Sequence, residues 1–154
     1  MQYYDFLESP LGIIKITSSD VAIFSLHLID SIDFDVIPND ITNMCKLQLQ
    51  EYFMNKRTEF TLPLDLQGTE FQKNVWNELI KIPYGKTASY KDIAISIGNP
   101  KASRAVGGAV NKNPIFIVIP CHRVIGSNGN LVGFAIGLDK KSCLLDLEKK
   151  YPRE

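Results

Sequence analysis

The chain has 154 residues, of which 45% are hydrophobic and 22% charged, with a formal net charge of +0. A chain of this size forms one compact unit or two small lobes. Its three cysteines lack paired spacing, which argues against a disulfide framework, and no apolar run is long enough to span a membrane. With no secretory signal visible at the amino terminus, we expect a cytoplasmic protein in a reducing compartment.

The charges are distributed unevenly along the chain. Residues 1–65 contain four basic and ten acidic side chains, whereas residues 66–154 contain thirteen basic and seven acidic ones. A basic half joined to an acidic half is typical of a protein whose second half binds a polyanion. The alternative is a chance distribution of charge over a solvated surface.

The first 65 residues predict a small sheet with one covering helix. Strand-like runs at residues 2–8, 12–18 and 21–29 are separated by turn residues, so an antiparallel meander is expected. Asp40 is suited to cap a helix, and apolar residues including Cys45 then recur at helical spacing.

Helix-start signals dominate the next part of the chain. Thr69 to Gln72 and Ser89 to Asp92 both have the form of a capping box. The second box opens a short helix that Gly98 closes, and Asn99-Pro100 are suited to cap a further helix over residues 101–111. Two short helices joined by a glycine-containing turn predict a helix-turn-helix.

The second helix of this motif carries unusually small residues. Gly107 and Gly108 lie in its interior, where each costs about 1 kcal/mol relative to alanine. Ala102 and Ser103 are small as well, and Arg104 is the long cationic side chain of the helix. Such a surface allows a flat or bulky partner to approach the backbone, although tight packing against a neighbouring helix is the alternative.

A cysteine follows the most apolar run of the chain. Residues 115–119 are rich in β-branched side chains and predict a fully buried strand, which Pro120 should end because proline cannot donate to a ladder. Cys121 is then next to His122 and Arg123, and nearby positive charge favours the thiolate. An inert buried cysteine is the alternative.

Several motifs follow one another in a fixed order: Gly68-Thr69-Glu70-Phe71-Gln72, Ile82-Pro83-Tyr84-Gly85-Lys86, Ser89-Tyr90, Gly98-Asn99-Pro100-Lys101-Ala102, Arg104-Ala105-Val106-Gly107-Gly108-Ala109, Asn113-Pro114 and Pro120-Cys121-His122-Arg123-Val124. In this order and spacing they resemble the O6-alkylguanine-DNA alkyltransferases. The resemblance covers residues 66–150 closely and the amino-terminal part loosely, chiefly at Ser9-Pro10-Leu11-Gly12.

The resemblance implies an α+β fold with two domains. Residues 1–65 would form a ribonuclease-H-like lobe, a small antiparallel sheet with a covering helix. Residues 66–154 would form a mainly helical DNA-binding and alkyl-transfer domain with a helix-turn-helix of winged-helix type. The family implies a monomer without a cofactor, and the zinc ligands that some relatives carry in the first lobe are missing here.

The same resemblance implies DNA repair by a protein that reacts once. An alkyl group on guanine O6, and on thymine O4, would pass irreversibly to Cys121. In the family a water links this cysteine to the base matching His122, and the residue matching Glu148 orients the imidazole. Asn113 matches the asparagine that holds the cysteine turn, and Tyr90 matches the tyrosine that turns the nucleotide phosphate and helps guanine to leave.

The resemblance also implies how double-stranded DNA is bound. The helix-turn-helix would enter the minor groove, where Ala102, Ser103, Gly107 and Gly108 leave room, and Arg104 would fill the gap in the base stack. The alkylated atom is inaccessible inside the duplex, so the base must be flipped out at a cost of a few kcal/mol.

The family's base pocket matches a second group of residues. The N–H of Ala135 would contact the guanine oxygen, and the carbonyls of Cys121 and Val124 would contact the exocyclic amine. Phe134 and Ile136 would line the same pocket, and the bulk at residue 136 is expected to disfavour large alkyl groups.

Three other functions remain as alternatives. An alkyltransferase-like damage sensor flips the base without transfer, but those relatives carry tryptophan at the position of Cys121. A cysteine hydrolase could use Cys121 and His122, although residues adjacent on an extended segment point to opposite faces. A DNA-binding regulator would leave the Cys-His pair and Glu148 unexplained. Arg123 is expected to be structural, tying the cysteine turn to a final helix over residues 139–150.

Overall fold

The computed structural model describes residues 1–126 and 137–150 of the chain. These residues form two compact units, residues 1–66 and residues 67–149, each with its own buried apolar side chains. Within the described ranges, no helix is both long and apolar enough to cross a lipid bilayer.

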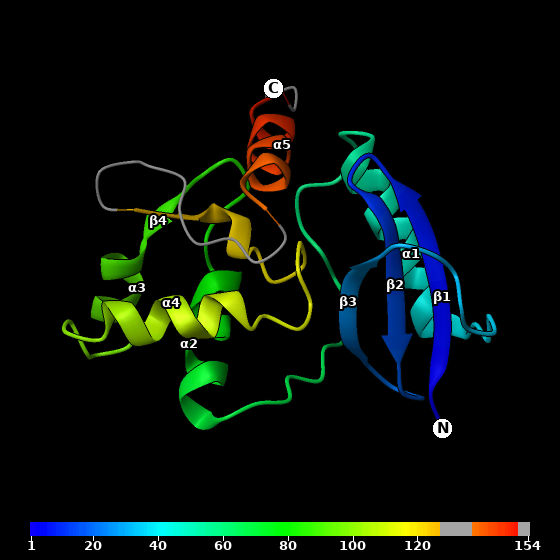
Figure 1. Ribbon diagram of the computed structural model, residues 1–154, viewed down its shortest axis with the longest axis horizontal. Coiled ribbons are helices and arrows are strands. Elements are labelled where there is room, and N and C mark those ends of the chain that lie inside the picture. The colour runs from blue at the N-terminus through cyan, green and yellow to red at the C-terminus, as the bar shows by residue number, and fades with distance from the viewer. Residues whose placement is uncertain (127–136, 151–154) are drawn as a thin grey trace. The chain divides into compact units, whose positions relative to one another are not determined.

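The first unit is a three-stranded antiparallel sheet covered by one helix (Figure 1). The strands pair in chain order, and the elements are β1 (Tyr3–Ser9), β2 (Gly12–Ser18), β3 (Ile23–Ile29) and α1 (Asp40–Phe53). Ile14 and Ile16 of β2 are fully buried, as are Cys45, Leu49 and Tyr52 of α1. The predicted meander and its covering helix are therefore confirmed.

The cap of α1 lies one residue earlier than predicted. Asn39, not Asp40, is the N-cap residue. Its side chain accepts the Thr42 N–H at 2.8 Å, and the Thr42 hydroxyl accepts the Asn39 N–H at 2.9 Å. Both Asn and Asp favour this position, and the reciprocal bond from Thr42 selects Asn39.

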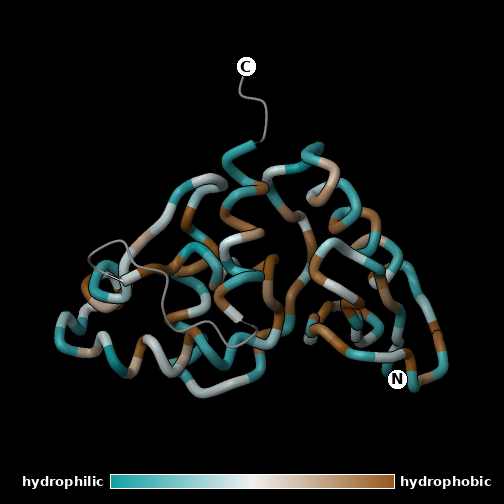
Figure 2. Tube along the Cα trace, turned by 45° about the horizontal axis from the view of Figure 1, so that its top comes forward, coloured by the Kyte–Doolittle hydropathy of each residue, from teal (hydrophilic) through white to brown (hydrophobic). Residues whose placement is uncertain are grey.

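The second unit is mainly helical (Figure 1). Its elements are α2 (Glu70–Ile80), β4 (Ala88–Ser89), α3 (Tyr90–Ser96), α4 (Ser103–Asn111), a 3-10 turn (Cys121–Arg123), β5 (Val124–Ile125) and α5 (Leu138–Lys149). The two short strands β4 and β5 pair in parallel. Hydrophilic and hydrophobic stretches alternate along the helices, as expected for helices with one buried face (Figure 2).

The capping residues in the sequence correctly predicted where α2 and α3 begin, but not where α4 begins. Thr69 and Ser89 make the capping boxes predicted for α2 and α3, and Gly98 closes α3 in the left-handed region with φ +82°. Helix α4, however, begins at Ser103 rather than near residue 101, and no side chain caps it. Asn99 is instead used in the preceding turn, where its carbonyl accepts the Ala102 N–H at 3.0 Å.

The apolar run before the cysteine is buried but is not a strand, contrary to the prediction. The Val118 N–H donates to the Phe116 carbonyl at 2.9 Å, which closes a γ-turn around Ile117 with φ 73°. A second such bond, from the Cys121 N–H to the Ile119 carbonyl at 2.7 Å, closes an inverse γ-turn around Pro120. A positive φ at a β-branched residue is strained by about 1–3 kcal/mol.

Helices α2 and α4 are joined through a buried tryptophan. Val75, Trp76 and Leu79 form the buried face of α2, whereas Ile80 is 42% exposed. The indole N–H of Trp76 donates to the Ala109 carbonyl of α4 at 2.9 Å. This bond links α2 to the last turn of α4.

We predict that Gly68→Ala destabilises the second unit. A Cβ atom at residue 68 would lie 2.7 Å from the Cη2 atom of the buried Trp76 ring, and overpacking against a rigid ring costs about 1–3 kcal/mol. Trp76 is the only tryptophan of the chain, so its fluorescence during urea unfolding reports on this unit.

Gly108→Ala is the matched control for this substitution. No atom lies within 4 Å of a Cβ at residue 108, and alanine in a helix interior is favoured over glycine by about 1 kcal/mol. The urea midpoint should therefore fall for Gly68→Ala and rise for Gly108→Ala. An unchanged midpoint for the first variant would contradict the packing described for Trp76.

Candidate active site

Cys121 begins a 3-10 turn and is buried, with 5% of its surface exposed. The turn leads into β5, whose Val124 and Ile125 pair with Ala88 and Ser89 of β4. Because β4 leads directly into Tyr90, this pairing brings the tyrosine and the cysteine to the same part of the unit. Their proximity is reflected in the pKa of the tyrosine hydroxyl, which burial and the charge of the Cys121 thiolate both raise.

His122 and Glu148 form a fully buried pair. The distance between His122 Nε2 and Glu148 Oε2 is 2.6 Å, and both side chains are wholly excluded from solvent. A neutral imidazole that donates through Nε2 has Nδ1 as its acceptor. Nδ1 is buried and makes no hydrogen bond to another atom of the described residues, so it is the ring atom that can take a proton.

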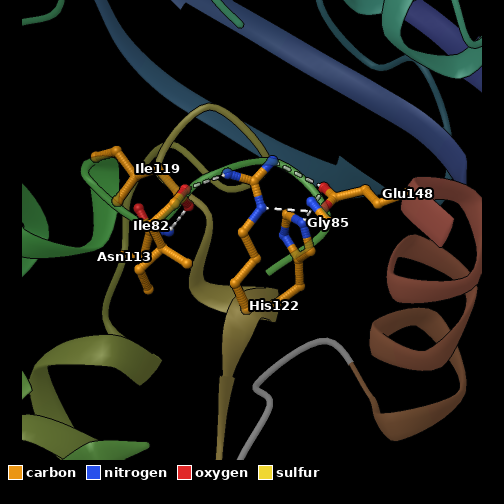
Figure 3. Close-up of polar contacts among 7 residues, drawn as sticks. Ile82, Gly85, Asn113, Ile119, His122 and Glu148 are labelled. Carbon is orange, nitrogen blue, oxygen red and sulfur yellow. Dashed lines mark hydrogen bonds and ion pairs between the residues drawn. The ribbon is translucent and has the colours of Figure 1, made fainter. Parts of the chain in front are cut away.

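The Glu148 carboxylate is shared with two other groups (Figure 3). The Arg123 guanidinium donates from Nε to Oε1 and from Nη2 to Oε2, each at 2.9 Å. The Gly85 N–H donates to Oε1 at 3.1 Å. Although burial raises the pKa of Glu148, the bonds from His122 and Arg123 hold it well below its ordinary range, so the group is ionised at neutral pH.

Asn113 holds the strained segment that precedes the cysteine. Its Nδ2 donates to the Ile119 carbonyl at 2.7 Å (Figure 3). Its Oδ1 accepts the Ile115 N–H at 2.9 Å. The Asn113 side chain thereby binds the backbone on both sides of the γ-turn, at Ile115 and at Ile119. A hydrogen bond between Asn113 and Cys121 also lowers the pKa of the thiol.

Lys141 of α5 is a site residue that the sequence analysis missed. It is fully buried, and its ammonium group donates to the Val124 carbonyl. Burial lowers the pKa of this amine, and the charge of Cys121 opposes that shift. Lys141 lies seven residues before Glu148, so both side chains lie on one face of α5. That spacing was the available signal.

Opposing effects act on the pKa of the Cys121 thiol. Burial raises its pKa to about 11, while the bond from Asn113, the charge of Lys141 and nearby backbone N–H groups lower it. Desolvation disfavours the thiolate, and the amine and amide groups supply the positive potential that opposes this effect.

The exposed face of α4 is bare. Arg104, Ala105 and Gly108 are exposed, whereas Ser103 and Gly107 are partly buried. A Cβ atom at Gly107 would lie 3.8 Å from the Tyr90 ring, and one at Gly108 would meet open space. The Tyr90 ring is therefore in van der Waals range of a side chain at residue 107, whereas residue 108 faces open space.

Other predicted site residues have mixed outcomes. Val124 is buried beside the cysteine turn, and Ala102 is the N-cap residue of α4. Phe134, Ala135 and Ile136 lie outside the described residues. Cys143 is exposed, because the buried positions of α5 are Lys141, Leu144 and Glu148.

Comparison with known proteins gives a consistent family. The family model "6-O-methylguanine DNA methyltransferase, DNA binding domain" matches residues 70–150, and the "ribonuclease-like domain" of the same family matches residues 2–66. A methylated-DNA–protein-cysteine methyltransferase of Methanosarcina barkeri is 48% identical over 98% of this chain and 99% of its own length. A Mycolicibacterium paratuberculosis protein of the same name is 43% identical over 96% of this chain and 93% of its own length.

Solved structures agree with these matches. The crystal structure of Mycobacterium tuberculosis O6-methylguanine methyltransferase superimposes with a TM-score of 0.89 at 40% identity, covering 99% of this chain and 96% of that one. The Mycobacterium tuberculosis OGT in complex with DNA gives a TM-score of 0.89 at 41% identity, covering 96% of this chain and 93% of that one. Two family models that together span nearly the whole sequence, and relatives alike over their full length, show that the chain belongs to the 6-O-methylguanine DNA methyltransferase family.

Proposed function

We propose that this protein repairs DNA by moving the alkyl group of O6-alkylguanine, and of O4-alkylthymine, to Cys121 in a single turnover. The observation that carries the proposal is the buried Cys121 thiol next to the His122–Glu148 pair, whose Nε2–Oε2 distance is 2.6 Å. The names of the relatives, which are methylated-DNA–protein-cysteine methyltransferases, support the same reaction.

The first step is proton removal from the thiol. The proton passes from Cys121 to Nδ1 of His122, directly or through a bridging water, and Glu148 stabilises the imidazolium that forms. The positive charge of Lys141 favours the thiolate that remains. Cys121 is thus the nucleophile and His122 the base, and the Glu148 carboxylate orients the imidazole of that base.

The second step is a single displacement at the alkyl carbon. The sulfur forms a bond to carbon as the carbon–oxygen bond breaks, and the electron pair of that bond passes to guanine. Tyr90 supplies a proton to the departing base, and the proton held by His122 balances this loss. The product is a thioether, which water and thiols do not reverse, so each molecule reacts once.

DNA enters through the helix-turn-helix formed by α3 and α4. We propose that the bare face of α4 lies in the minor groove of a double-stranded partner, with the exposed Arg104 filling the stack where the base was flipped out. Small residues at Ala105 and Gly108 would allow the backbone of α4 to approach the duplex. A monomer suffices, because the thiol and the helix belong to the same unit.

A non-catalytic damage sensor is the competing function. It would use the same bare helix but needs no nucleophile. A buried thiol with a neighbouring imidazole, a carboxylate and an amine supports transfer rather than sensing, because none of these groups is required for binding alone.

The direct test is to weigh the protein after incubation with duplex DNA that contains O6-methylguanine. A mass increase of one methylene on a peptide containing Cys121 is expected, with one equivalent transferred per protein. Cys121→Ala should bind the same DNA without any gain in mass. Transfer by that variant, or repeated turnover by the natural chain, would refute the proposed chemistry.

Gly108→Ala should separate stability from DNA binding. The added methyl group fits the free protein, so the urea midpoint should rise, yet it projects from the exposed face of α4. The rate of methyl transfer from duplex DNA should fall about tenfold or more, as expected when about 1–3 kcal/mol of contact is lost. Transfer from free O6-methylguanine should not change. Equal loss on both substrates would argue against docking through this face.

Lys141→Met should make the thiol less acidic. Loss of a facing positive charge raises the pKa of Cys121 by roughly one unit, so alkylation by iodoacetamide below that pKa should slow roughly tenfold. Peptide mass analysis separates Cys121 from the exposed Cys143, which is the internal reference. Lys140→Met is the matched control, because it removes one charge from the neighbouring position. Equal rates in the two variants would exclude an electrostatic role for Lys141.

A further inference from the structure

Arg123 makes more contacts than are needed to hold the cysteine turn against α5. The residue is 6% exposed, and its guanidinium donates to both oxygens of Glu148 at 2.9 Å and from Nη1 to the Ile82 carbonyl at 2.7 Å. The guanidinium also faces the Tyr84 ring, with 5.6 Å between Cζ and the ring centroid. This bidentate geometry fixes the carboxylate in one orientation.

The position of the Arg123 guanidinium affects the charge state of the His122 imidazole. Oε2 of Glu148 accepts from His122 Nε2 and from Arg123 Nη2 at once. A buried carboxylate that faced only the imidazole would strongly favour the charged imidazolium. An imidazolium has no free electron pair and cannot accept the proton of a thiol. The guanidinium compensates for the negative charge that would otherwise act on His122 alone.

We propose that Arg123 is a positioning residue that shares the charge of Glu148 and thereby keeps the His122 imidazole neutral and able to accept a proton from Cys121. The proposal rests on the alkyl-transfer function argued above. It assigns Arg123 a task in the chemistry beyond holding the cysteine turn against α5. The same arrangement leaves Glu148 ionised and free to stabilise the imidazolium once it forms.

All charged groups that face the imidazole must be considered together. Glu148 and Lys141 face it from α5, Arg123 and Cys121 belong to its own turn, and Tyr84 lies in the segment packed against Arg123. Burial lowers the pKa of His122, Glu148 raises it, and the charges of Arg123 and Lys141 lower it further. Removal of Arg123 therefore raises this pKa, and the neutral base is then populated only at higher pH.

The test compares Arg123→Gln with Arg123→Lys in single-turnover transfer from methylated duplex DNA between pH 5 and 9. Loss of the charge in Arg123→Gln should move the acidic limb of the rate profile to higher pH by about one unit. At a given pH on that limb the transfer rate should therefore fall about tenfold. Arg123→Lys retains the charge and should keep the limb in place, although its rate falls. A limb that stays at the same pH in both variants would overturn the proposal, since a purely structural role lowers the rate without moving it.

A second measurement needs neither DNA nor a variant that folds well. Imidazole 15N shifts of the natural protein report the protonation of His122, with the exposed His27 as the reference because the chain has two histidines. A neutral His122 at pH 7 that carries its proton on Nε2 is expected. A protonated His122 at pH 7 would overturn the role of Arg123. If Cys121 gains no alkyl group while His122 is neutral, the alkyl-transfer function fails and with it the task of Arg123 in that reaction. A protonated His122 in a protein that does transfer the group fails the role of Arg123 alone.

Discussion

The Glu148 carboxylate has no exposed surface and accepts hydrogen bonds from His122, Arg123 and Gly85 (Figure 3). An uncompensated buried charge is strongly unfavourable, and removal of one partner of such a pair costs about 3–5 kcal/mol. His122 and Arg123 belong to the cysteine turn and Gly85 to the turn before β4, so one anion on α5 joins these two turns to the helix. The carboxylate proposed to orient the base is consequently also a structural centre of the second unit.

Burial has two consequences for the nucleophile. It raises the pKa of Cys121 to about 11, which protects the thiol from ionising in the free protein. It also strengthens each interaction with Asn113 and Lys141, since charges act over a lower dielectric away from water. A thiol that is protected yet surrounded by groups able to stabilise its anion suits a protein that can react only once.

The sequence predicted features that depend on adjacent residues better than those that depend on the whole fold. The boxes at Thr69 and Ser89 are local and were found, as was the burial of residues 115–119. Hydrophobicity indicates burial but not backbone conformation, so the γ-turn at Ile117 was read as a strand. Lys141 was overlooked because a lysine in a terminal helix usually faces solvent. Its seven-residue spacing from Glu148 indicates a shared helix face, but only the packing of α5 shows that this face is buried at Lys141. The roles of Cys121, His122 and Glu148 came from family resemblance, whereas their geometry came from the structure.

The composition of α4 has an energetic consequence for DNA recognition. The helix contains Gly107 and Gly108 in its interior and begins without a side-chain cap, and both features lower intrinsic helix stability. Its outer amides should exchange with deuterium sooner than those of α2, which has a complete capping box. Contact with a duplex would then slow that exchange, and part of the association free energy would be spent on ordering the helix. The helix proposed to approach the nucleic acid would thus be more rigid in the complex than in the free protein.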